Sequence, residues 1–594
     1  MTSSENEWNL LFTPVIKLVK QICGLPRSYP TSALYHQYIL GINNPWDQIC
    51  ANQITSFTYL INSNSLASRS IMIRCRAAQL RLAIHDNIFE HESESLFLGH
   101  QEAKSNLSLH NIIIARKLNI VIQQDYINRT TWAISGLVKK RTHIQKNGEK
   151  IDCLIIEVCN IKIYSDNPQK AIIQKQECPK IITIAQHNAL VLPIFIRLST
   201  GAITHIDWYY MVDSLHNMAE NTIVNLGAAF YTNNEEGEYS VYSSLSLWPS
   251  STRAEIVAIF LALLTAPENS NVTIYTDSLG AINSINSAFD STTRKWLKKT
   301  NNLIIIKIIM LIREASINIK LVKIKGHSGI IGNDIADKLA KKGQCGNNFF
   351  RNNVDFIDNI LSYFPVFIDN PIEVNIRRFI LKILATYEAT EWSLLKNNQE
   401  LCYTNINQID WKITWLIFHY CKGFHCTSMQ TNYLWTFIAK LFHKILPLGS
   451  ILALRKPKLY KEMKCVMNCN KEENWNHLFE CQAYELIWQK ILEITTEESI
   501  IICLKQKQIK CQGEDFIRNV IQDILRVTAK SEKFQKFQHL ALEVKVETYL
   551  TTKLQKDFKI TLNEAQILMA NILIRFILTF KKLLWKPRCE QVIL

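Results

Sequence analysis

The sequence has little that would place it in a membrane or outside the cell. Its most apolar late stretch, residues 567–584, is interrupted by Asn571, Arg575, Lys581 and Lys582, which predicts a packed helix and not a membrane span. Residues 1–7 are polar and acidic, unlike a secretion signal. The 16 cysteines are scattered over 594 residues, which favours reduced thiols that are buried or bound to metal. We therefore expect a cytosolic or nuclear protein with no membrane partner.

Acidic residues are scarce relative to basic ones. There are 52 Asp and Glu against 67 Lys and Arg, which gives a formal net charge of +15. Such a balance favours polyanionic partners, nucleic acid first and a membrane surface second. The 47% of apolar residues is typical of globular proteins, and the length predicts several domains.

The chain divides by pattern into four parts. Residues 1–130 predict a helical region; in it, arginines at 69, 74, 76 and 81 form either a solvated helix face or a nucleic-acid contact. Residues 131–203 predict a strand-rich connector, and residues 204–344 an α/β domain. Residues 345–594 predict a helical C-terminal region, which begins with a polar linker to about residue 370.

Within residues 204–344 strands come first and then alternate with helices. The predicted strands are 205–212, 222–232, 239–247, 272–277 and 317–324, and a helical pattern covers 251–264. Three strands that can pair as hairpins, followed by alternating helix and strand, predict a mixed sheet with helices on its faces.

Four carboxylates and one histidine stand in distinctive contexts within this domain. Asp213 follows an apolar run, Glu255 opens the helical pattern, and Asp277 ends a β-branched run. His327 lies in Gly-His-Ser-Gly, and Asp337 lies in the last predicted helix. In this order and context the five residues resemble the catalytic set of a type 1 ribonuclease H, which cuts the RNA strand of an RNA–DNA hybrid.

The resemblance implies a mixed five-stranded sheet with flanking helices and a carboxylate cluster at one edge. It also implies that a basic, aromatic-bearing region within 290–313 grips the hybrid. An order of Asp, Glu, Asp, Asp with a late histidine differs from integrases and transposases of the same fold, which carry two aspartates and then a glutamate. The family usually has Asp-Gly-Ser at its first aspartate, whereas this chain has Asp213-Ser214-Leu215, and the loss of the glycine either strains the turn or crowds the substrate backbone.

Four clustered carboxylates suit the hydrolysis of a phosphodiester with two divalent ions. Hard oxygen ligands favour Mg²⁺ or Mn²⁺, and the histidine can move protons at the leaving group or assist metal exchange. Each residue also has a structural explanation. Thr252 and Glu255 form a capping-box pattern, Asp277 could cap the next helix, Asp213 could be a turn residue, and Asp337 could pair with Lys341.

A second cluster of candidate ligands lies downstream. Cys465, Cys469, His477 and Cys481 have the spacing Cys-x3-Cys-x7-His-x3-Cys. Three thiolates and one imidazole match a closed tetrahedral Zn²⁺ site of structural type, although the first spacing is one residue longer than the commonest form. The alternative is a set of buried thiols that bind no metal.

The order of ribonuclease H domain, then Arg455-Lys456-Pro457-Lys458-Leu459-Tyr460, then the cysteine–histidine cluster resembles the C-terminal part of a LINE-type (non-LTR) retrotransposon polyprotein. The N-terminal region resembles the segment C-terminal to the polymerase palm in such elements. No Asp-Asp dipeptide occurs in the sequence, which excludes polymerisation by a paired-aspartate palm.

Three functions compete at this point. The first is a metal-dependent endonuclease for RNA–DNA hybrids, derived from a retrotransposon. The second is a catalytically inactive nucleic-acid-binding protein with a ribonuclease H-like fold, favoured by Ser214. The third is a scaffold whose zinc-bound C-terminal region binds a protein or RNA.

Overall fold

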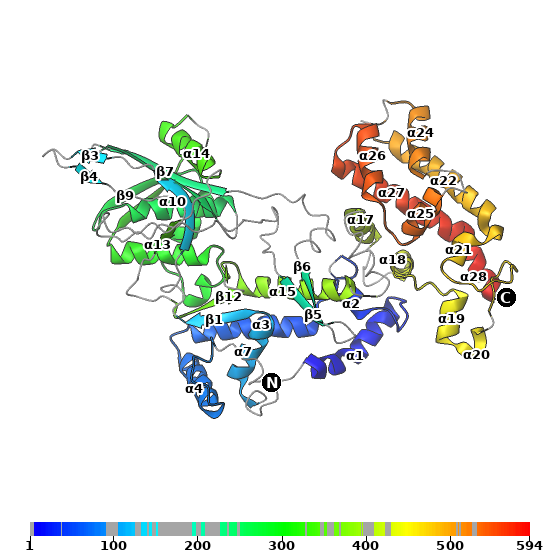
Figure 1. Ribbon diagram of the computed structural model, residues 1–594, viewed down its shortest axis with the longest axis horizontal. Coiled ribbons are helices and arrows are strands. Elements are labelled where there is room, and N and C mark those ends of the chain that lie inside the picture. The colour runs from blue at the N-terminus through cyan, green and yellow to red at the C-terminus, as the bar shows by residue number, and fades with distance from the viewer. Residues whose placement is uncertain are drawn as a thin grey trace. The chain divides into compact units, whose positions relative to one another are not determined.

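The computed structural model covers the whole chain. It describes residues 5–36, 38–90, 105–124, 132–138, 142–144, 150–152, 193–197, 203–207, 226–234, 237–245, 250–326, 329–344, 350–352, 361–367, 370–393, 395, 409–421, 429–461, 463–506, 509, 512–525 and 532–593. Contacts divide the chain into two compact units (Figure 1). Unit 1 comprises residues 1–9, 45–192 and 219–384, and unit 2 comprises residues 10–44, 193–218 and 385–594.

The N-terminal part of unit 1 is a group of helices on a small sheet. The helices are α3 (Pro45–Ile61), α4 (Leu66–Arg81) and α7 (Leu107–Lys117); α1 (Glu5–Ile22) contributes only its first residues to this unit. Polar side chains cap two of them: the Ser65 hydroxyl accepts from Ser68 N at 3.4 Å, and Asn106 Oδ1 accepts from Ser108 N at 3.1 Å. The sheet consists of β1 (Ile120–Gln124), β12 (Tyr363–Phe367) and β13 (Asn370–Pro371), all antiparallel.

The α/β part of unit 1 follows the predicted order of elements. The hairpin β7 (Leu226–Asn234) and β8 (Gly237–Leu245) precedes α10 (Ser251–Leu264) and β9 (Asn271–Thr276). Then come α11 (Leu279–Asn286), α12 (Thr293–Trp296), α13 (Asn302–Glu314), β10 (Asn318–Lys323) and α14 (Ile331–Gln344). Helices α10 and α13 are buried along most of their length, because isoleucine and leucine occur on nearly every face of both. They form the core of this part together with strand residues.

The predicted single five-stranded sheet is wrong for the residues that the structure describes. Strands β9 and β10 pair in parallel as a two-stranded sheet. The hairpin β7–β8 instead joins β2 (Trp132–Val138) and β11 (Phe350–Asn352) in a four-stranded sheet of order β11-β2-β8-β7. The strand predicted at 205–212 is described only over β6 (Ile203–Asp207), where it pairs with β5 (Pro193–Arg197) in unit 2. The described residues of β6 therefore do not join the β7–β8 hairpin to β9 in one sheet.

The elements described between residues 131 and 203 are all strands. Besides β2 and β5, they are β3 (Thr142–Ile144) and β4 (Lys150–Asp152), which pair with each other. Residues 153–192 of this predicted connector lie outside the described residues.

The polar linker predicted up to about residue 370 is wrong over β12. All five residues of this strand are buried, and it pairs with β1 from Ile120↔Phe367 to Gln124↔Tyr363. The two faces of β12 serve different cores: Phe364 and Val366 pack in the α/β core, whereas Tyr363 packs with the N-terminal helices. The apolar run Tyr-Phe-Pro-Val-Phe could have predicted this strand. The polar residues before it led instead to the prediction of a linker.

Unit 2 is mainly helical. Its described elements include α2 (Thr31–Tyr35), the last turns of α15 (Ile376–Ser393), α17 (Trp411–Cys421), α18 (Met429–Phe442), α19 (Gly449–Arg455), α20 (Pro457–Tyr460), α21 (His477–Glu480), η3 (Gln482–Tyr484), α22 (Glu485–Leu504), α24 (Glu514–Leu525), α25 (Glu532–Leu542), α26 (Thr548–Phe558), α27 (Leu562–Phe580), the π-helical turn η4 (Lys581–Trp585) and α28 (Lys586–Ile593).

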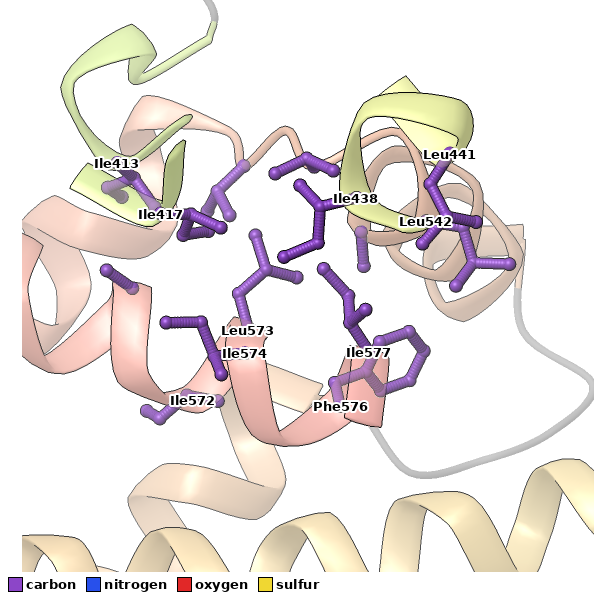
Figure 2. Close-up of a cluster of buried hydrophobic side chains, with 14 of the residues drawn as sticks. Ile413, Ile417, Ile438, Leu441, Leu542, Ile572, Leu573, Ile574, Phe576 and Ile577 are labelled. Carbon is purple, nitrogen blue, oxygen red and sulfur yellow. The ribbon is translucent and has the colours of Figure 1, made fainter. Parts of the chain in front are cut away.

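Helix α27 is the centre of the unit 2 core. It begins with a capping box in which Thr561 and Glu564 bond reciprocally, and twelve of its residues are buried. Figure 2 shows aliphatic side chains of α27 among those of α17, α18 and α25, with Ile572, Leu573 and Ile577 among the labelled residues. Each such side chain contributes about 1.5–3 kcal/mol by leaving water.

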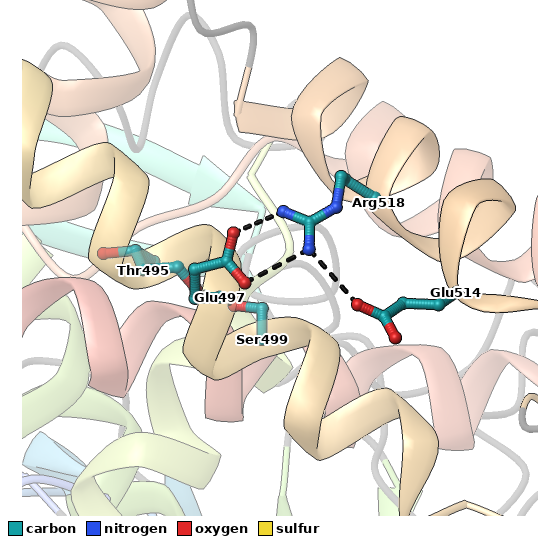
Figure 3. A network of polar contacts seen from close by, with 5 residues as sticks. All are labelled: Thr495, Glu497, Ser499, Glu514 and Arg518. Carbon is teal, nitrogen blue, oxygen red and sulfur yellow. Dashed lines mark hydrogen bonds and ion pairs between the residues drawn. The ribbon is translucent and has the colours of Figure 1, made fainter.

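The surface of unit 2 carries an ion-pair network between α22 and α24. Arg518 donates to both oxygens of Glu497 and to Glu514 Oε1 (Figure 3); its Nη2 lies 3.2 Å from Glu497 Oε2 and 3.2 Å from Glu514 Oε1. The pair at Glu497 is bidentate, which fixes how the two helices lie against each other.

Two expectations about the chain as a whole concern thiols and membranes. Every cysteine that the structure describes is a free thiol, and seven of these nine are buried. No helix among the described residues combines the length and apolarity that a membrane crossing requires.

Candidate active site and metal centre

Glu255 lies just after the first turn of α10, and its carboxylate is bonded at the end of β9. Ser250 caps the helix, because its hydroxyl accepts from Arg253 N at 3.1 Å. The alternative that Thr252 and Glu255 form a capping box is therefore wrong. Glu255 Oε2 instead accepts a hydrogen bond from the Thr276 hydroxyl at 2.8 Å. The carboxylate is thus held across two elements.

Asp277 directly follows β9 and is half-buried. The alternative that Asp277 caps the next helix is also wrong, because Ser278 has that role and accepts from Ala281 N at 3.2 Å. The Asp277 side chain therefore remains available for another task.

The loop that carries His327 passes against Asp277. A Cβ atom placed on Gly326 would lie only 2.6 Å from Asp277 Oδ2, so only glycine allows this approach. Thus the loop brings the residue next to His327 into contact with the aspartate. His327 itself lies outside the described residues.

A lysine stands beside the carboxylates at the end of β10. Lys323 Nζ donates to the backbone oxygen of Asp277 and, at 2.8 Å, to that of Ile324. In the parallel pairing Lys323 lies opposite Thr276, the residue that bonds Glu255. The two strand ends therefore bring one cation and two carboxylates to the same place.

The charges of two other predicted carboxylates act on Glu255. Burial raises the pKa of Glu255, the Thr276 hydrogen bond opposes this, and the negative charges of Asp277 and Asp337 raise the pKa further. Lys323 acts in the opposite direction. Repulsion of this kind is what a bound divalent cation relieves, and the ligand atoms are the hard oxygens that Mg²⁺ and Mn²⁺ prefer. The donor chemistry therefore suits such an ion, whereas among the described residues only Cys465, Cys469, His477 and Cys481 bring three or more possible ligand atoms within 4.8 Å of one another.

The structure describes three of the five predicted active-site residues. Asp277 and the half-buried Asp337 of α14 lie near enough to Glu255 for their charges to act on it. Asp213 and His327 lie outside the described residues. Sequence reasoning missed Thr276 and Lys323. Their signal was available, since Thr276 ends β9 and Lys323 ends β10, two strands that the sequence predicted.

These carboxylates define a class: an α/β domain with Asp277 at the end of a parallel strand and with Glu255 and Asp337 on the helices α10 and α14. Comparison with protein families is consistent with that class, because residues 213–344 match the family model described as RNase H. This match supports a ribonuclease H domain of α/β type, of which residues 219–344 lie in unit 1. Comparisons with curated proteins and with solved structures give no significant match.

The cysteine–histidine cluster in unit 2 is compact. One ligand atom from each of Cys465, Cys469, His477 and Cys481 lies within 4.8 Å of the others. Cys465 Sγ and Cys481 Sγ are 3.9 Å apart, and Cys469 Sγ is 3.1 Å from His477 Nε2. Ligands at about 2.0–2.3 Å from a tetrahedral Zn²⁺ are separated by roughly 3.5–3.8 Å. The cluster therefore fits Zn²⁺.

Local backbone geometry brings these ligands together. Between the first two cysteines the chain turns back, so that Cys465 N donates to Lys471 O at 2.9 Å and Asn468 N donates to Cys465 O at 3.1 Å. Asn468 and Asn470 have positive φ values of 57° and 64°, which asparagine tolerates better than most residues. Residues 465–471 therefore form a tight loop, called the ligand loop below.

Glu473, between the second and third ligands, connects the ligand loop to two helices. It is buried, accepts from Gly449 N at 2.8 Å and from Arg588 Nε at 2.8 Å, and is also bonded by Arg588 Nη2. Gly449 is needed for this approach, since a Cβ atom there would lie 3.2 Å from Glu473 Cβ. The ligand loop is thus attached to α19 and α28.

Proposed function

We propose that the protein is a metal-dependent endonuclease that hydrolyses the RNA strand of RNA–DNA hybrids. The observation that carries this proposal is the approach of Glu255, Asp277 and Asp337 within a domain that matches RNase H. The charges of Asp277 and Asp337 oppose the ionised form of Glu255, an unfavourable arrangement that a bound cation would neutralise.

Each residue then has a role. Asp213, Glu255, Asp277 and Asp337 are the proposed ligands of Mg²⁺ or Mn²⁺, ions that supply an activated water and stabilise charge on the phosphate when they are bound. Thr276 orients Glu255 through its hydrogen bond. Gly326 lets the His327 loop lie beside Asp277, where the imidazole can pass a proton to the leaving oxygen.

The test is cleavage of an end-labelled RNA–DNA hybrid by the full chain with Mg²⁺ or Mn²⁺, beside Asp277→Asn. Cleavage of only the RNA strand, abolished in the variant, supports the proposal. Hybrid binding by a parent chain that does not cleave with either metal would favour the second candidate, an inactive nucleic-acid-binding protein. This second candidate is retained because Ser214 stands where the resembled family usually has glycine.

We also propose that Cys465, Cys469, His477 and Cys481 bind one structural Zn²⁺, as their spacing and proximity support. Descent from a LINE-type retrotransposon belongs to the same proposal, since the order of domain and cluster resembles that of such elements. The four-part division and a cytosolic or nuclear location remain predictions, the latter supported by free thiols at every described cysteine.

A further inference from the structure

Unit 1 contains a cleft whose charged lining residues are all cations. The cleft has a volume of about 740 Å³ and lies between α3, the segment around α12 and the start of α15. Its charged lining residues are Arg294, Lys298, Arg377 and Arg378, and among the described residues no Asp or Glu contributes to the lining. A concave site with charge of one sign concentrates ligands of the opposite sign.

The positive charge of this cleft is not neutralised by its neighbours. Arg294, Lys298 and Arg378 are exposed, and within the described part of the chain none of the four cations forms an ion pair. Arg377 donates to neutral amide oxygens, those of Asn52 and Gln48, each at 2.8 Å. These bonds fix the position of its guanidinium and leave its charge in place.

Neutral groups in the same cleft suit phosphate and nucleotide contacts. Ser56, Asn64 and Thr292 present exposed hydroxyl or amide groups, which commonly bond phosphate oxygens. Tyr59 adds a half-buried aromatic ring, and the Arg294 guanidinium lies 5.8 Å from its centroid. Cations, hydroxyls and an aromatic face together are typical of a nucleic-acid backbone site.

Two walls of the cleft come from outside the ribonuclease H match. Arg294 and Lys298 belong to residues 213–344, whereas α3 and the first turn of α15 do not. We propose that α3 and α15 complete a binding site for the phosphodiester backbone of the nucleic acid, beyond the position of cleavage. This inference rests on the proposed function for its substrate class, and it assigns a substrate contact to Arg377 and Arg378.

The test is hybrid binding by the full chain, measured by fluorescence anisotropy without added divalent metal across a range of salt. Lys298→Glu with Arg378→Glu is expected to weaken binding at least about tenfold at ~0.1 M salt and to reduce the salt slope by roughly 2, because two phosphate contacts are lost. The matched control is Lys117→Glu with Lys320→Glu, an equal charge change at exposed positions of unit 1 outside both the cleft and residues 290–313.

The outcomes distinguish the cleft from the catalytic proposal. Arg378→Lys with Lys298→Arg keeps the charges and should restore binding. If the glutamate variant binds with the affinity and salt slope of the control, the cleft proposal is overturned, even when the parent cleaves hybrids. If the variant loses binding but the parent cleaves nothing, the cleft stands and the nuclease proposal fails. If the parent binds poly-glutamate but not the hybrid, and the glutamate variant loses that binding, the cleft is a protein-docking surface. This result would also overturn the cleft proposal.

Discussion

Arg253 and Glu373 face each other in a buried, bidentate ion pair. Nη1 lies 2.7 Å from Oε2 and Nη2 lies 3.0 Å from Oε1, and the residues are 120 positions apart in the chain. Arg253 also donates to Asn301 Oδ1 at 3.3 Å, while the Glu373 backbone oxygen accepts from Asn301 N at 2.7 Å. The pair therefore joins the helix that bears Glu255 to the segment that leads into α15.

Removing one partner of this pair should be costly. Arg253→Met leaves the Glu373 carboxylate buried without its cation, and we expect a loss of about 3–5 kcal/mol in the free energy of unfolding. The double variant Arg253→Met with Glu373→Leu should recover most of that loss, because no charge remains buried. Urea unfolding of the parent, the two single variants and the double variant measures the coupling energy between Arg253 and Glu373. If the losses of the two single variants simply add in the double variant, the prediction is contradicted.

Glu255→Gln separates a ligand role from a helix-capping role. Ser250 caps α10, and a glutamine oxygen can still accept from Thr276, so the melting temperature should hardly change. Hybrid cleavage should fall by orders of magnitude, because one negative ligand is lost. Ser250→Ala is the matched control: it should cost about 1 kcal/mol of stability and keep cleavage. Cleavage by Glu255→Gln at the parent rate would refute the four-carboxylate mechanism.

Gly326→Ala should disturb the site through Asp277. The new methyl group would lie 2.6 Å from Oδ2, so the carboxylate or the loop must move. A displacement of about 1 Å can reduce a rate by about 10²-fold, which is the loss of hybrid cleavage that we expect. Gly280→Ala is the control, since its methyl group meets Thr252 at an ordinary 3.5 Å. Equal cleavage rates for the two variants would rule out the close approach.

Zinc should stabilise unit 2 alone. We expect one Zn²⁺ per chain by mass spectrometry of protein purified without chelators, and its loss in Cys481→Ser but not in Cys503→Ala, a buried thiol outside the cluster. Chelation should loosen the C-terminal helices and leave the ribonuclease H domain folded, because the ligands lie in unit 2. Hydrogen exchange can follow both units. Protein without zinc that shows parental exchange in unit 2 would contradict the proposal.

His443 should make unit 2 less stable in acid. Burial lowers its pKa to about 4, and its Nε2 accepts from Trp392 Nε1 at 3.1 Å, which requires the neutral ring. The unfolded chain binds this proton near pH 6.5 and the folded chain only near pH 4, so stability falls as the pH drops through that window, by about 3 kcal/mol in total. Urea unfolding of His443→Gln should show a flatter pH dependence, whereas exposed His419→Gln should match the parent.

Local patterns accounted for much of the α/β domain. The helix predicted at 251–264 is α10, and the strands predicted at 272–277 and 317–324 are β9 and β10 within one residue at each end. These elements were predictable because a helix or a strand core follows from its own periodicity. The compact set of zinc-ligand candidates was also predictable, because its ligands are close in sequence.

Pairings over long sequence distances were not predictable. Nothing in Arg253 identifies Glu373 as its partner, and nothing in β1 identifies β12. The choice of Ser250 over Thr252 as helix cap was also hidden, because both are hydroxyl residues two positions apart. The basic cleft was invisible for the same reason, since its walls come from three separate segments.

The pairing of β1 with β12 has a consequence for how the protein is made. Val121 cannot meet Val366 until everything between them, the whole ribonuclease H match included, has left the ribosome. Closing such a long loop is slow, and Phe364 and Val366 reach the α/β core only when it closes. A domain excised at residues 213–344 would therefore lack three of its own core residues, Leu361, Phe364 and Val366, and a functional fragment must extend past β12.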